Sequence, residues 1–151
     1  MRRIILGSGS PRRKEILENA GYNVEVRTSD KKELSIVGKN YTEELVNECA
    51  KLKAKNVYEE LLPNDILVAS DTVVVNDNVI IGKPKDRDDA IRILKSLSGK
   101  MHFVATSVCV IKNGIYKVSQ EITKVYFRNY DENEIISYID NFKPFDKAGS
   151  Y

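Results

Sequence analysis

The stretch that decides the fold is Ile66–Val75, which reads Ile-Leu-Val-Ala-Ser-Asp-Thr-Val-Val-Val. An almost unbroken apolar run of this kind is typical of a central strand that is covered on both faces. Upstream, Ile4–Leu6 predicts a short buried strand, and a helix should follow it, with Ser10 as its N-cap and Pro11 at its first position. Because strands and helices alternate here and the hairpin signal Asn113-Gly114 comes later, the sequence predicts an α/β fold with a mixed, twisted sheet and flanking helices.

The remaining elements follow from periodicity and capping residues. Further strands are expected over Tyr22–Val26, Val79–Ile81, Phe103–Ile111 and Ile115–Phe127. Helices are expected to about Leu62 from a cap at Thr42 or Asn40, from Asp86 to Leu97 and from Asp131 to about Asn141. The last ten residues, Phe142–Tyr151, have the composition of a loop.

Composition excludes several classes of protein. The chain has 151 residues, enough for one domain or two small lobes that share a core. Lys and Arg number 24 and Asp and Glu number 22, and this near balance argues against a DNA-coating protein or a polybasic membrane binder. The two cysteines, Cys49 and Cys109, form no metal-binding motif or disulfide framework, and they are expected in the core.

Nothing in the sequence points to a membrane. No apolar run approaches the roughly 20 residues that span a bilayer. The apolar stretch at the N-terminus, Ile4–Leu6, is far too short for a signal peptide. We therefore expect a cytoplasmic protein.

A candidate phosphate site lies in Gly7-Ser8-Gly9-Ser10-Pro11-Arg12-Arg13. Small residues let the backbone approach a ligand closely, and the start of a helix offers free amide groups and a positive dipole. The hydroxyls of Ser8 and Ser10 add donors, and the planar guanidinium groups of Arg12 and Arg13 can each grip a phosphate at two points. The alternative is a capped helix with surface arginines.

A second candidate is Asp71, which stands in an apolar strand within Ser70-Asp71-Thr72. A buried carboxylate is costly unless it is paired, hydrogen-bonded or bound to a metal. At the end of the strand it could hold a divalent cation or deprotonate a water molecule, although a salt bridge would also explain it. Weaker signals come from Lys83 in Gly82-Lys83-Pro84, from Lys53 on a basic helix, from Glu33 in a polar loop, and from the single histidine, His102, for which a structural role is favoured.

Six segments in chain order resemble the Maf family of nucleoside triphosphate pyrophosphatases. They are Leu6–Leu17, Ala50–Ala54, Ser70–Val73, Gly82–Pro84, Leu97–Gly99 with His102, Val104 and Thr106, and Asp146–Tyr151. No single segment is decisive, but six in register along the whole chain are highly specific. The resemblance implies two lobes around a deep cleft, in a fold similar to that of inosine triphosphatase. It also implies cleavage of a nucleoside triphosphate into the monophosphate and pyrophosphate, with Mg²⁺, Mn²⁺ or Co²⁺ as cofactor.

The resemblance also assigns roles to residues. Asp71 matches the catalytic acid that accepts a proton from the attacking water. Ser8, Arg12, Arg13, Lys53 and Lys83 match positions that line the substrate site, and Ser10 and Thr72 complete the expected substrate-binding set. Glu33 approximately matches an acid that assists Asp71 at the metal, although the acid that the family tends to place before it is replaced here by Lys32.

The resemblance narrows the substrate to one branch of the family. The branch that acts on 7-methyl-GTP carries Tyr, Gln and Cys where this chain has Arg12, Thr72 and Lys147. The chain therefore resembles the branch that hydrolyses dTTP, UTP and modified pyrimidine analogues. Such enzymes are called housecleaning enzymes, are often homodimers, and have been linked to septum formation.

The family continues past the position of Tyr151 with Gly-Ile-Gln and a further tail. Residues 1–151 are therefore expected to form a single Maf-like domain that lacks its C-terminal tail. The alternative function is that of a catalytically impaired regulatory protein that binds a nucleotide or a nucleic acid. The near-neutral charge counts against nucleic acid.

Overall fold

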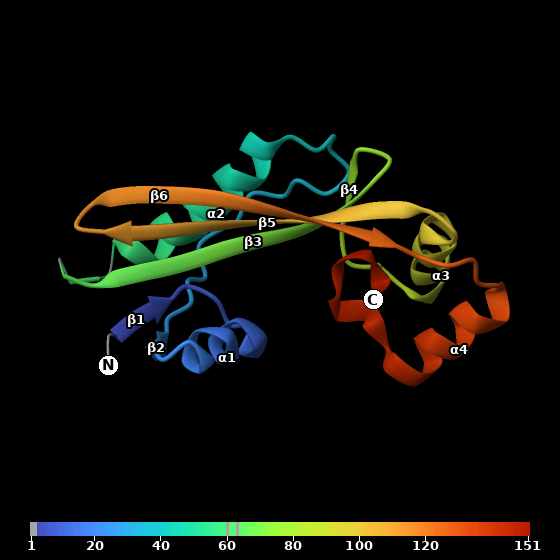
Figure 1. Cartoon of the computed structure of the whole chain (residues 1–151), viewed down its shortest axis with the longest axis horizontal. Coiled ribbons are helices and arrows are strands. Elements are labelled where there is room, and N and C mark those ends of the chain that lie inside the picture. The colour runs from blue at the N-terminus through green and yellow to red at the C-terminus, as the bar shows by residue number, and fades with distance from the viewer. Residues whose placement is uncertain (1–2, 60, 63) are drawn as a thin grey trace. The chain divides into compact units, whose positions relative to one another are not determined.

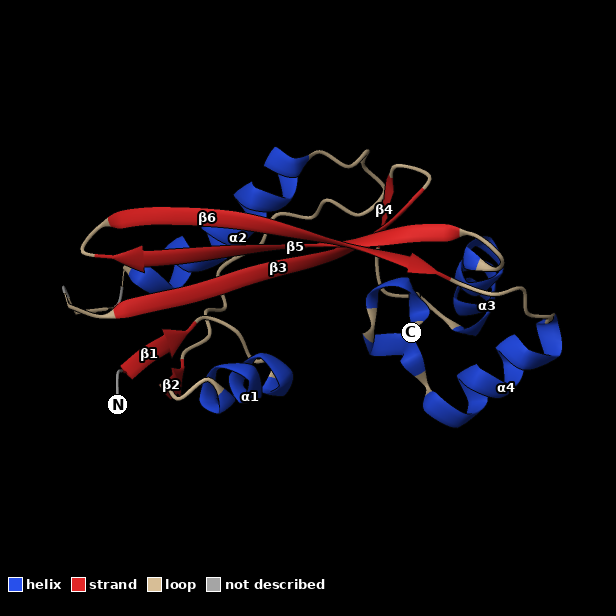
Figure 2. Cartoon of the chain, viewed as in Figure 1, coloured by secondary structure: helices blue, strands red, loops and turns tan. Residues whose placement is uncertain are grey.

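The computed structural model, which describes residues 3–59, 61–62 and 64–151, confirms the α/β fold (Figure 1). The strands are β1 (Arg3–Leu6), β2 (Asn23–Val26), β3 (Ile66–Asn76), β4 (Val79–Ile81), β5 (Met101–Lys112) and β6 (Ile115–Tyr126). The helices are α1 (Pro11–Asn19), α2 (Glu43–Tyr58), α3 (Arg87–Leu97) and α4 (Glu132–Phe142). Two 3-10 turns follow, η1 (Pro144–Asp146) and η2 (Ala148–Ser150), as the colouring by secondary structure in Figure 2 shows.

The strands form one six-stranded mixed sheet. Its order is β2-β1-β3-β5-β6, and β4 pairs with β3 away from this path. β1 is parallel to both β2 and β3, whereas β4 is antiparallel to β3. Two parallel neighbours flank β1, so the loops that follow β1 and β2 leave the same, carboxyl edge of the sheet.

Contacts divide the chain into two compact units. The first unit comprises Met1–Ser35, Thr42–Thr72 and Thr106–Glu121, and the second comprises Ile36–Tyr41, Val73–Ala105 and Ile122–Tyr151. The single-domain organisation and the cleft that the resemblance implies stay predictions.

The core of the first unit lies between α2 and one face of the sheet. Ala50, Ala54 and Val57 of α2 pack against alternate strand residues, which are Ile5, Leu67, Ala69, Cys109 and Ile111. The opposite face, which includes Ile66 and Val68, lines a hollow of about 650 Å³ beside Leu17 of α1. The expectation that β3 is covered on both faces is therefore wrong for this part of the strand. Ile66 and Val68 are only half-buried, because α1 covers little of their face.

In the second unit, α3 packs against α4. The buried contact joins Ala90 and Leu94 to Ile135 and Ile139. The part of β3 in this unit, Val73–Asn76, is buried throughout. The prediction of a covered strand holds for these residues.

Most local predictions are confirmed. Ser10, Thr42 and Asp131 each cap a helix through the side chain, and Asn113 and Gly114 take the positive φ values that a tight hairpin turn requires. α2 ends at Tyr58 rather than near Leu62, because the chain turns there and Leu61 N donates to Tyr58 O at 3.0 Å.

The expectation of a plain loop over the last ten residues is wrong, since η1 and η2 lie within them. Lys143 ends α4 in the left-handed conformation, and Pro144, whose φ suits a helical turn, begins η1 directly after it. No helix in the described ranges is both long enough and apolar enough to cross a bilayer.

Candidate active site

The loop between β1 and α1 is fixed at both ends. Gly7 N donates to Val68 O of β3 at 2.8 Å, and Ser8 Oγ accepts from Ser10 N at 3.1 Å. Ser10 Oγ then accepts from Arg13 N at 3.4 Å, which is the N-cap that the sequence predicts. The amide groups at the start of α1 are thereby oriented as a group, and such an arrangement favours an anion.

Arg13 joins this loop to the strand that carries Asp71. Its guanidinium donates to Ser8 Oγ at 3.4 Å, to Ser70 O at 3.2 Å and to Thr72 Oγ1 at 3.1 Å. Burial lowers the pKa of Arg13, and the charge of Asp71 opposes this shift. These bonds use three of the five N–H groups of the guanidinium, so the remaining ones can still meet a ligand.

Asp71 lies in the middle of β3 and not at its end, where the sequence analysis placed it. Its side chain is 16% exposed, and Oδ1 accepts from Lys53 Nζ of α2 at 2.9 Å. The same ammonium lies 3.8 Å from Glu33 Oε2 in the loop after β2, and Glu33 is 63% exposed. Asp71, the predicted catalytic acid, and Glu33, the predicted second carboxylate, therefore both lie within 4 Å of the ammonium of Lys53, which was predicted to line the substrate site.

A cavity of about 310 Å³ lies beside this group of charges. Gly7, Ser8, Gly9, Arg13, Thr28, Ser29, Lys31, Glu33, Lys53, Asn56 and Val57 line it. Its walls come from the loops after β1 and β2 and from α2. The two loops meet because β1 and β2 are parallel neighbours, and ligands bind at this edge in many open α/β sheets.

The structure brings together only part of the predicted set. Ser8, Ser10, Arg13 and Thr72 form one hydrogen-bonded group. Lys53, Asp71 and Glu33 form a second group, and Asp71 and Thr72, which are neighbours on β3, bring the two groups side by side. Arg12 is exposed on α1, and no bond to it is found in the described part of the chain. Lys83 is exposed in the second unit, and its role stays a prediction.

The sequence analysis assigned no role to three residues of this region. Thr106 on β5 shares a hydrogen bond with Thr72, with 3.0 Å between their hydroxyl oxygens. Lys31 and Asn56 line the cavity. A Lys pair in a loop after a short strand is too common to single out Lys31, and only the pairing of β2 with β1 brings that loop to the site.

Cys49 lies close to the carboxylates but has the wrong protonation state for a nucleophile. Burial, followed by the charge of Asp71, raises the pKa of its thiol to about 11. A nucleophilic cysteine needs its thiolate near neutral pH. Cys49 and Cys109 are both buried, which confirms them as core residues.

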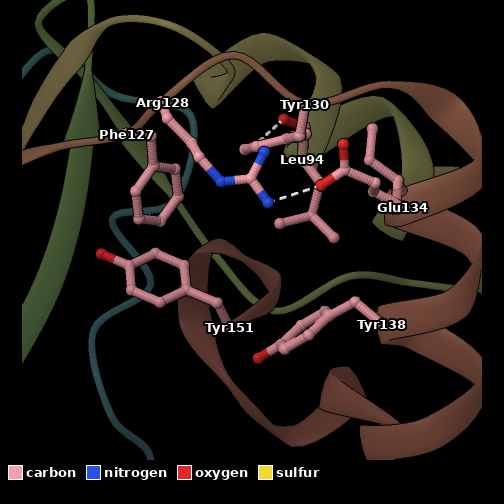
Figure 3. A pocket seen from close by; sticks show the side chains of 8 residues that line it. Leu94, Phe127, Arg128, Tyr130, Glu134, Tyr138 and Tyr151 are labelled. Carbon is pink, nitrogen blue, oxygen red and sulfur yellow. Dashed lines mark hydrogen bonds and ion pairs between the residues drawn. The ribbon is translucent and has the colours of Figure 1, made fainter.

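The second unit holds a cavity of a different character (Figure 3). It encloses about 340 Å³ and is lined mainly by rings and aliphatic side chains, among them Phe127, Tyr130, Tyr138 and Tyr151. Arg128 and Glu134 form an ion pair at 2.5 Å, so their opposite charges cancel. This chemistry suits an apolar group rather than a triphosphate.

Comparison with known proteins agrees with this picture. The family model described as Maf-like protein matches residues 3–151. A dTTP/UTP pyrophosphatase of Flavobacterium psychrophilum is 45% identical over 150 residues, which are 99% of this chain and 76% of that protein. A dTTP/UTP pyrophosphatase of Aquifex aeolicus is 43% identical over 149 residues, or 99% of this chain and 77% of that protein.

Solved structures agree at the level of the fold. A HAM1 protein from Coxiella burnetii superposes with a TM-score of 0.57 at 12% identity, over 83% of this chain and 73% of that one. A nucleoside-triphosphatase (dITP/XTP pyrophosphatase) from Mycobacterium abscessus gives a TM-score of 0.50 at 14% identity, over 82% of this chain and 73% of that one. The match of the family model along the chain, together with these sequence identities, shows that the chain belongs to the Maf-like protein family.

Proposed function

We propose that this chain is a nucleoside triphosphate pyrophosphatase that hydrolyses dTTP and UTP to the monophosphate and pyrophosphate. The observation that carries the proposal is the Lys53–Asp71 pair at 2.9 Å, which lies beside a cavity lined by cationic side chains and loop amides. Relatives with at least 40% identity carry the name dTTP/UTP pyrophosphatase. Arg12, Thr72 and Lys147 support the pyrimidine branch rather than the 7-methyl-GTP branch.

In this mechanism Asp71 prepares the nucleophile. The carboxylate accepts a proton from a water molecule while the water oxygen attacks the α-phosphorus. The bond from that phosphorus to the oxygen bridging it to the β-phosphorus breaks, and its electron pair leaves with pyrophosphate. The ammonium of Lys53 holds Asp71 Oδ1 in place, which fixes the orientation of the carboxylate before the substrate arrives.

Arg13 and the loop after β1 bind the negatively charged phosphates of the substrate. A triphosphate carries about four negative charges, and positioning with electrostatic stabilisation supplies most of the catalysis in phosphoryl transfer. Three protein partners hold the Arg13 guanidinium, so its free N–H groups are oriented in advance. Ser8 and the backbone of Gly9 add donors at the same wall of the cavity.

The carboxylates of Asp71 and Glu33 also fit a divalent cation. Within the described residues, no group of three or more His, Cys, Asp or Glu side chains could hold a metal ion. Mg²⁺, however, is usually held by one or two carboxylates, with waters and substrate phosphates as its other ligands. Asp71 and Glu33 both lie against the Lys53 ammonium, and together they would hold Mg²⁺, Mn²⁺ or Co²⁺ beside it. When bound, the ion would neutralise charge that develops on the phosphates.

The substrate range is tested by pyrophosphate release. The panel is dTTP, UTP, dCTP, GTP and 7-methyl-GTP, each with Mg²⁺ or Mn²⁺, and we expect release from dTTP and UTP above the others. Binding of dTTP without release would instead identify a regulatory nucleotide-binding protein. Because such substrates belong to the nucleotide pool of the cell interior, the cytoplasm is the compartment in which we expect the activity.

The catalytic role is tested with Asp71→Asn. The amide keeps the shape of the side chain but cannot take the proton, so we expect kcat to fall by at least about 100-fold. Circular dichroism should show a folded protein. The matched control is Asp77→Asn, which changes an aspartate just beyond the end of β3 whose side chain is 78% exposed. Near-normal turnover in Asp71→Asn would overturn the mechanism.

A further inference from the structure

Two threonines link Arg13 to the strand β5 through a chain of hydrogen bonds. Nη2 of Arg13 donates to Thr72 Oγ1 of β3 at 3.1 Å. The same Thr72 oxygen lies 3.0 Å from Thr106 Oγ1 on β5, which is the next strand of the sheet. All three residues belong to the first unit. Thr106 is therefore linked through Thr72 to the guanidinium that binds phosphate in the proposed mechanism.

The two terminal nitrogens of Arg13 are held by different groups. Nη1 donates to Ser8 Oγ at 3.4 Å and to Ser70 O at 3.2 Å, so both of its N–H groups are used. Nη2 donates one N–H to Thr72, which leaves its second N–H and that of Nε for a ligand. Because the guanidinium is planar, bonds at both terminal nitrogens fix the direction of the groups that are left. The position of the Thr72 hydroxyl thus helps to set where Arg13 meets a phosphate.

Thr72 depends on hydrogen bonds for its own position. Its side chain is exposed, so packing alone does not select one of its staggered rotamers. A hydroxyl has one donor site and two acceptor sites, so Thr72 can accept from Arg13 and also share a hydrogen bond with Thr106. Thr106 is half-buried, and its backbone is part of β5. The bond to Thr106 therefore favours the rotamer of Thr72 that also contacts Arg13.

The alternative is a pair of threonines that only joins two strands. Cross-strand threonine pairs of this kind stabilise sheets modestly. Such a pair needs no third partner, whereas Thr72 is also bonded to Arg13, whose other terminal nitrogen is bonded to Ser8 in the loop after β1. The connection of the pair to this loop favours a role in the site.

We propose that Thr106 is a positioning residue, which orients Arg13 for the triphosphate by holding the hydroxyl of Thr72. The inference rests on the proposed function, because it assigns a residue to the binding of that substrate. The carboxylate of Asp71 is held separately, by Lys53. Loss of the Thr106 hydroxyl should therefore raise the KM for dTTP more than it lowers kcat.

The test is Thr106→Val, which removes the hydroxyl and keeps the branched shape of the side chain. We expect the KM for dTTP to rise about fivefold, as the loss of one hydrogen bond predicts. Calorimetry should show the same loss of affinity for a dTTP analogue with an imido bridge between its α- and β-phosphates. Thr106→Ser keeps the hydroxyl and should retain both values. The matched control is Thr123→Val, which removes an exposed hydroxyl from the adjacent strand β6 and should change neither value.

A double-mutant cycle shows whether the effect passes through Thr72. Thr72→Val should weaken binding of the analogue by at least as much as Thr106→Val does. Adding Thr106→Val to Thr72→Val should then cause no further loss, because the residue through which Thr106 acts is already altered. Losses that multiply in the double variant would overturn the inference.

A measurement that needs no turnover is the Nε–H signal of Arg13 in a proton–nitrogen correlation spectrum, assigned with Arg13→Lys. A guanidinium that is held in place exchanges its protons slowly with water, so the signal should be sharp in the unmodified protein and in Thr106→Ser. It should broaden in Thr106→Val, whose folding is checked by circular dichroism. If the valine variant did not fold, Thr106→Ala would replace it in every measurement.

Each failure has its own signature. An unchanged Arg13 signal or an unchanged affinity in Thr106→Val would overturn the inference. So would an equal loss in Thr106→Ser, which would show that the methyl group matters and not the hydroxyl, or an equal loss in Thr123→Val, which would show a general effect on the sheet. Absence of pyrophosphate release from dTTP by the unmodified protein would overturn the proposed function, while the Arg13 signal would still decide the role of Thr106.

Discussion

At the scale of single residues, Gly7 and Gly9 are not required by the fold. Neither has a positive φ. A Cβ added at Gly9 would meet only Thr28 Cγ2, at 3.8 Å, and one at Gly7 would meet its nearest atoms at 3.5 Å, which are ordinary contacts. Because both residues line the cavity, the simplest reason for their small size is the close approach of a ligand to the backbone.

Gly9→Ala should therefore separate stability from binding. We expect the free energy of unfolding to stay constant or rise by up to about 1 kcal/mol, because alanine restricts the unfolded chain. The KM for dTTP should rise by about tenfold, since the methyl group enters the space of the phosphates. Thermal unfolding and steady-state kinetics measure the two effects.

Gly38→Ala is the matched control for that change. Gly38 has a φ of +86° with nothing within 4 Å of an added Cβ, so the cost is backbone strain alone. We expect a loss of about 1 kcal/mol in stability with no change in KM. A Gly9→Ala protein that loses stability and keeps its KM would contradict the assignment of this loop to phosphate binding.

Arg12 and Arg13 show what the sequence could and could not predict at this scale. Both are adjacent basic residues at the start of a helix, and composition assigns them the same role. Successive residues of a helix point about 100° apart, so only one of them can face the sheet. Arg13 faces it and bonds to Ser70 and Thr72, whereas Arg12 stays exposed. Which of the two side chains faces the sheet depends on how the helix packs against it, and the sequence of the helix alone does not determine that packing.

At the scale of elements, α1 depends on its ends rather than on a core. None of its residues is fully buried, and Ile16 is 61% exposed. Its position rests on the Ser10 cap, on Pro11 at its first turn and on the bonds of Arg13. These contacts all lie at the N-terminal end of α1. A substitution there should therefore also alter the loop between β1 and α1, which directly precedes the helix.

Ser10→Ala should therefore affect both stability and activity. Losing the cap should cost about 1 kcal/mol of unfolding free energy. KM for dTTP should also rise several-fold, because the amides at the start of α1 lose their fixed orientation. Asp131→Ala, which removes the equivalent cap of α4, should lower stability similarly and leave KM unchanged. If the KM for dTTP were the same in the two variants, Ser10 would serve only as the cap of its helix.

Elements were predicted well where their signals are local. The caps at Ser10 and Thr42 and the hairpin at Asn113-Gly114 depend on bonds between near neighbours, and all were confirmed. The contribution of Thr28, Ser29 and Lys31 to the cavity was not predicted, because it depends on the parallel pairing of β1 with β2, in which Ile4 lies opposite Val24. The burial of β3 was overestimated for a similar reason. The elements that pack on each face of the strand come from distant parts of the chain, so the sequence of β3 does not show whether they cover it.

At the scale of the whole molecule, folding is linked to pH through the one histidine. His102 is buried, with Nε2 2.6 Å from the Tyr151 hydroxyl and with Nδ1 lacking a hydrogen-bond partner among the described residues. Rings of Phe127 and Tyr151 pack around the imidazole. Burial, followed by the charge of Lys100, lowers the pKa of His102, so the folded protein opposes protonation of the ring.

The sign of the pH dependence follows from the difference between the two states. In the unfolded chain the histidine has its ordinary pKa near 6.5, so it takes up a proton as the pH falls from about 7. The folded state resists protonation until the pH is lower, and the unfolded state therefore binds more protons in this window. Stability should fall as the pH decreases through 6.5 and level off below the pKa of the folded state.

His102→Gln provides the test, because glutamine can keep a bond to Tyr151 without titrating. Free energies of unfolding from denaturant titrations at about pH 7.5, 6.5 and 5.5 should decrease for the unmodified protein and change less for the variant. Asp89, whose pKa is lowered by bonds from Lys85 and Arg92, is already ionised in both states across this window, so its effect begins at more acidic pH. Parallel pH profiles for the two proteins would show that protonation of His102 does not limit the stability of the fold.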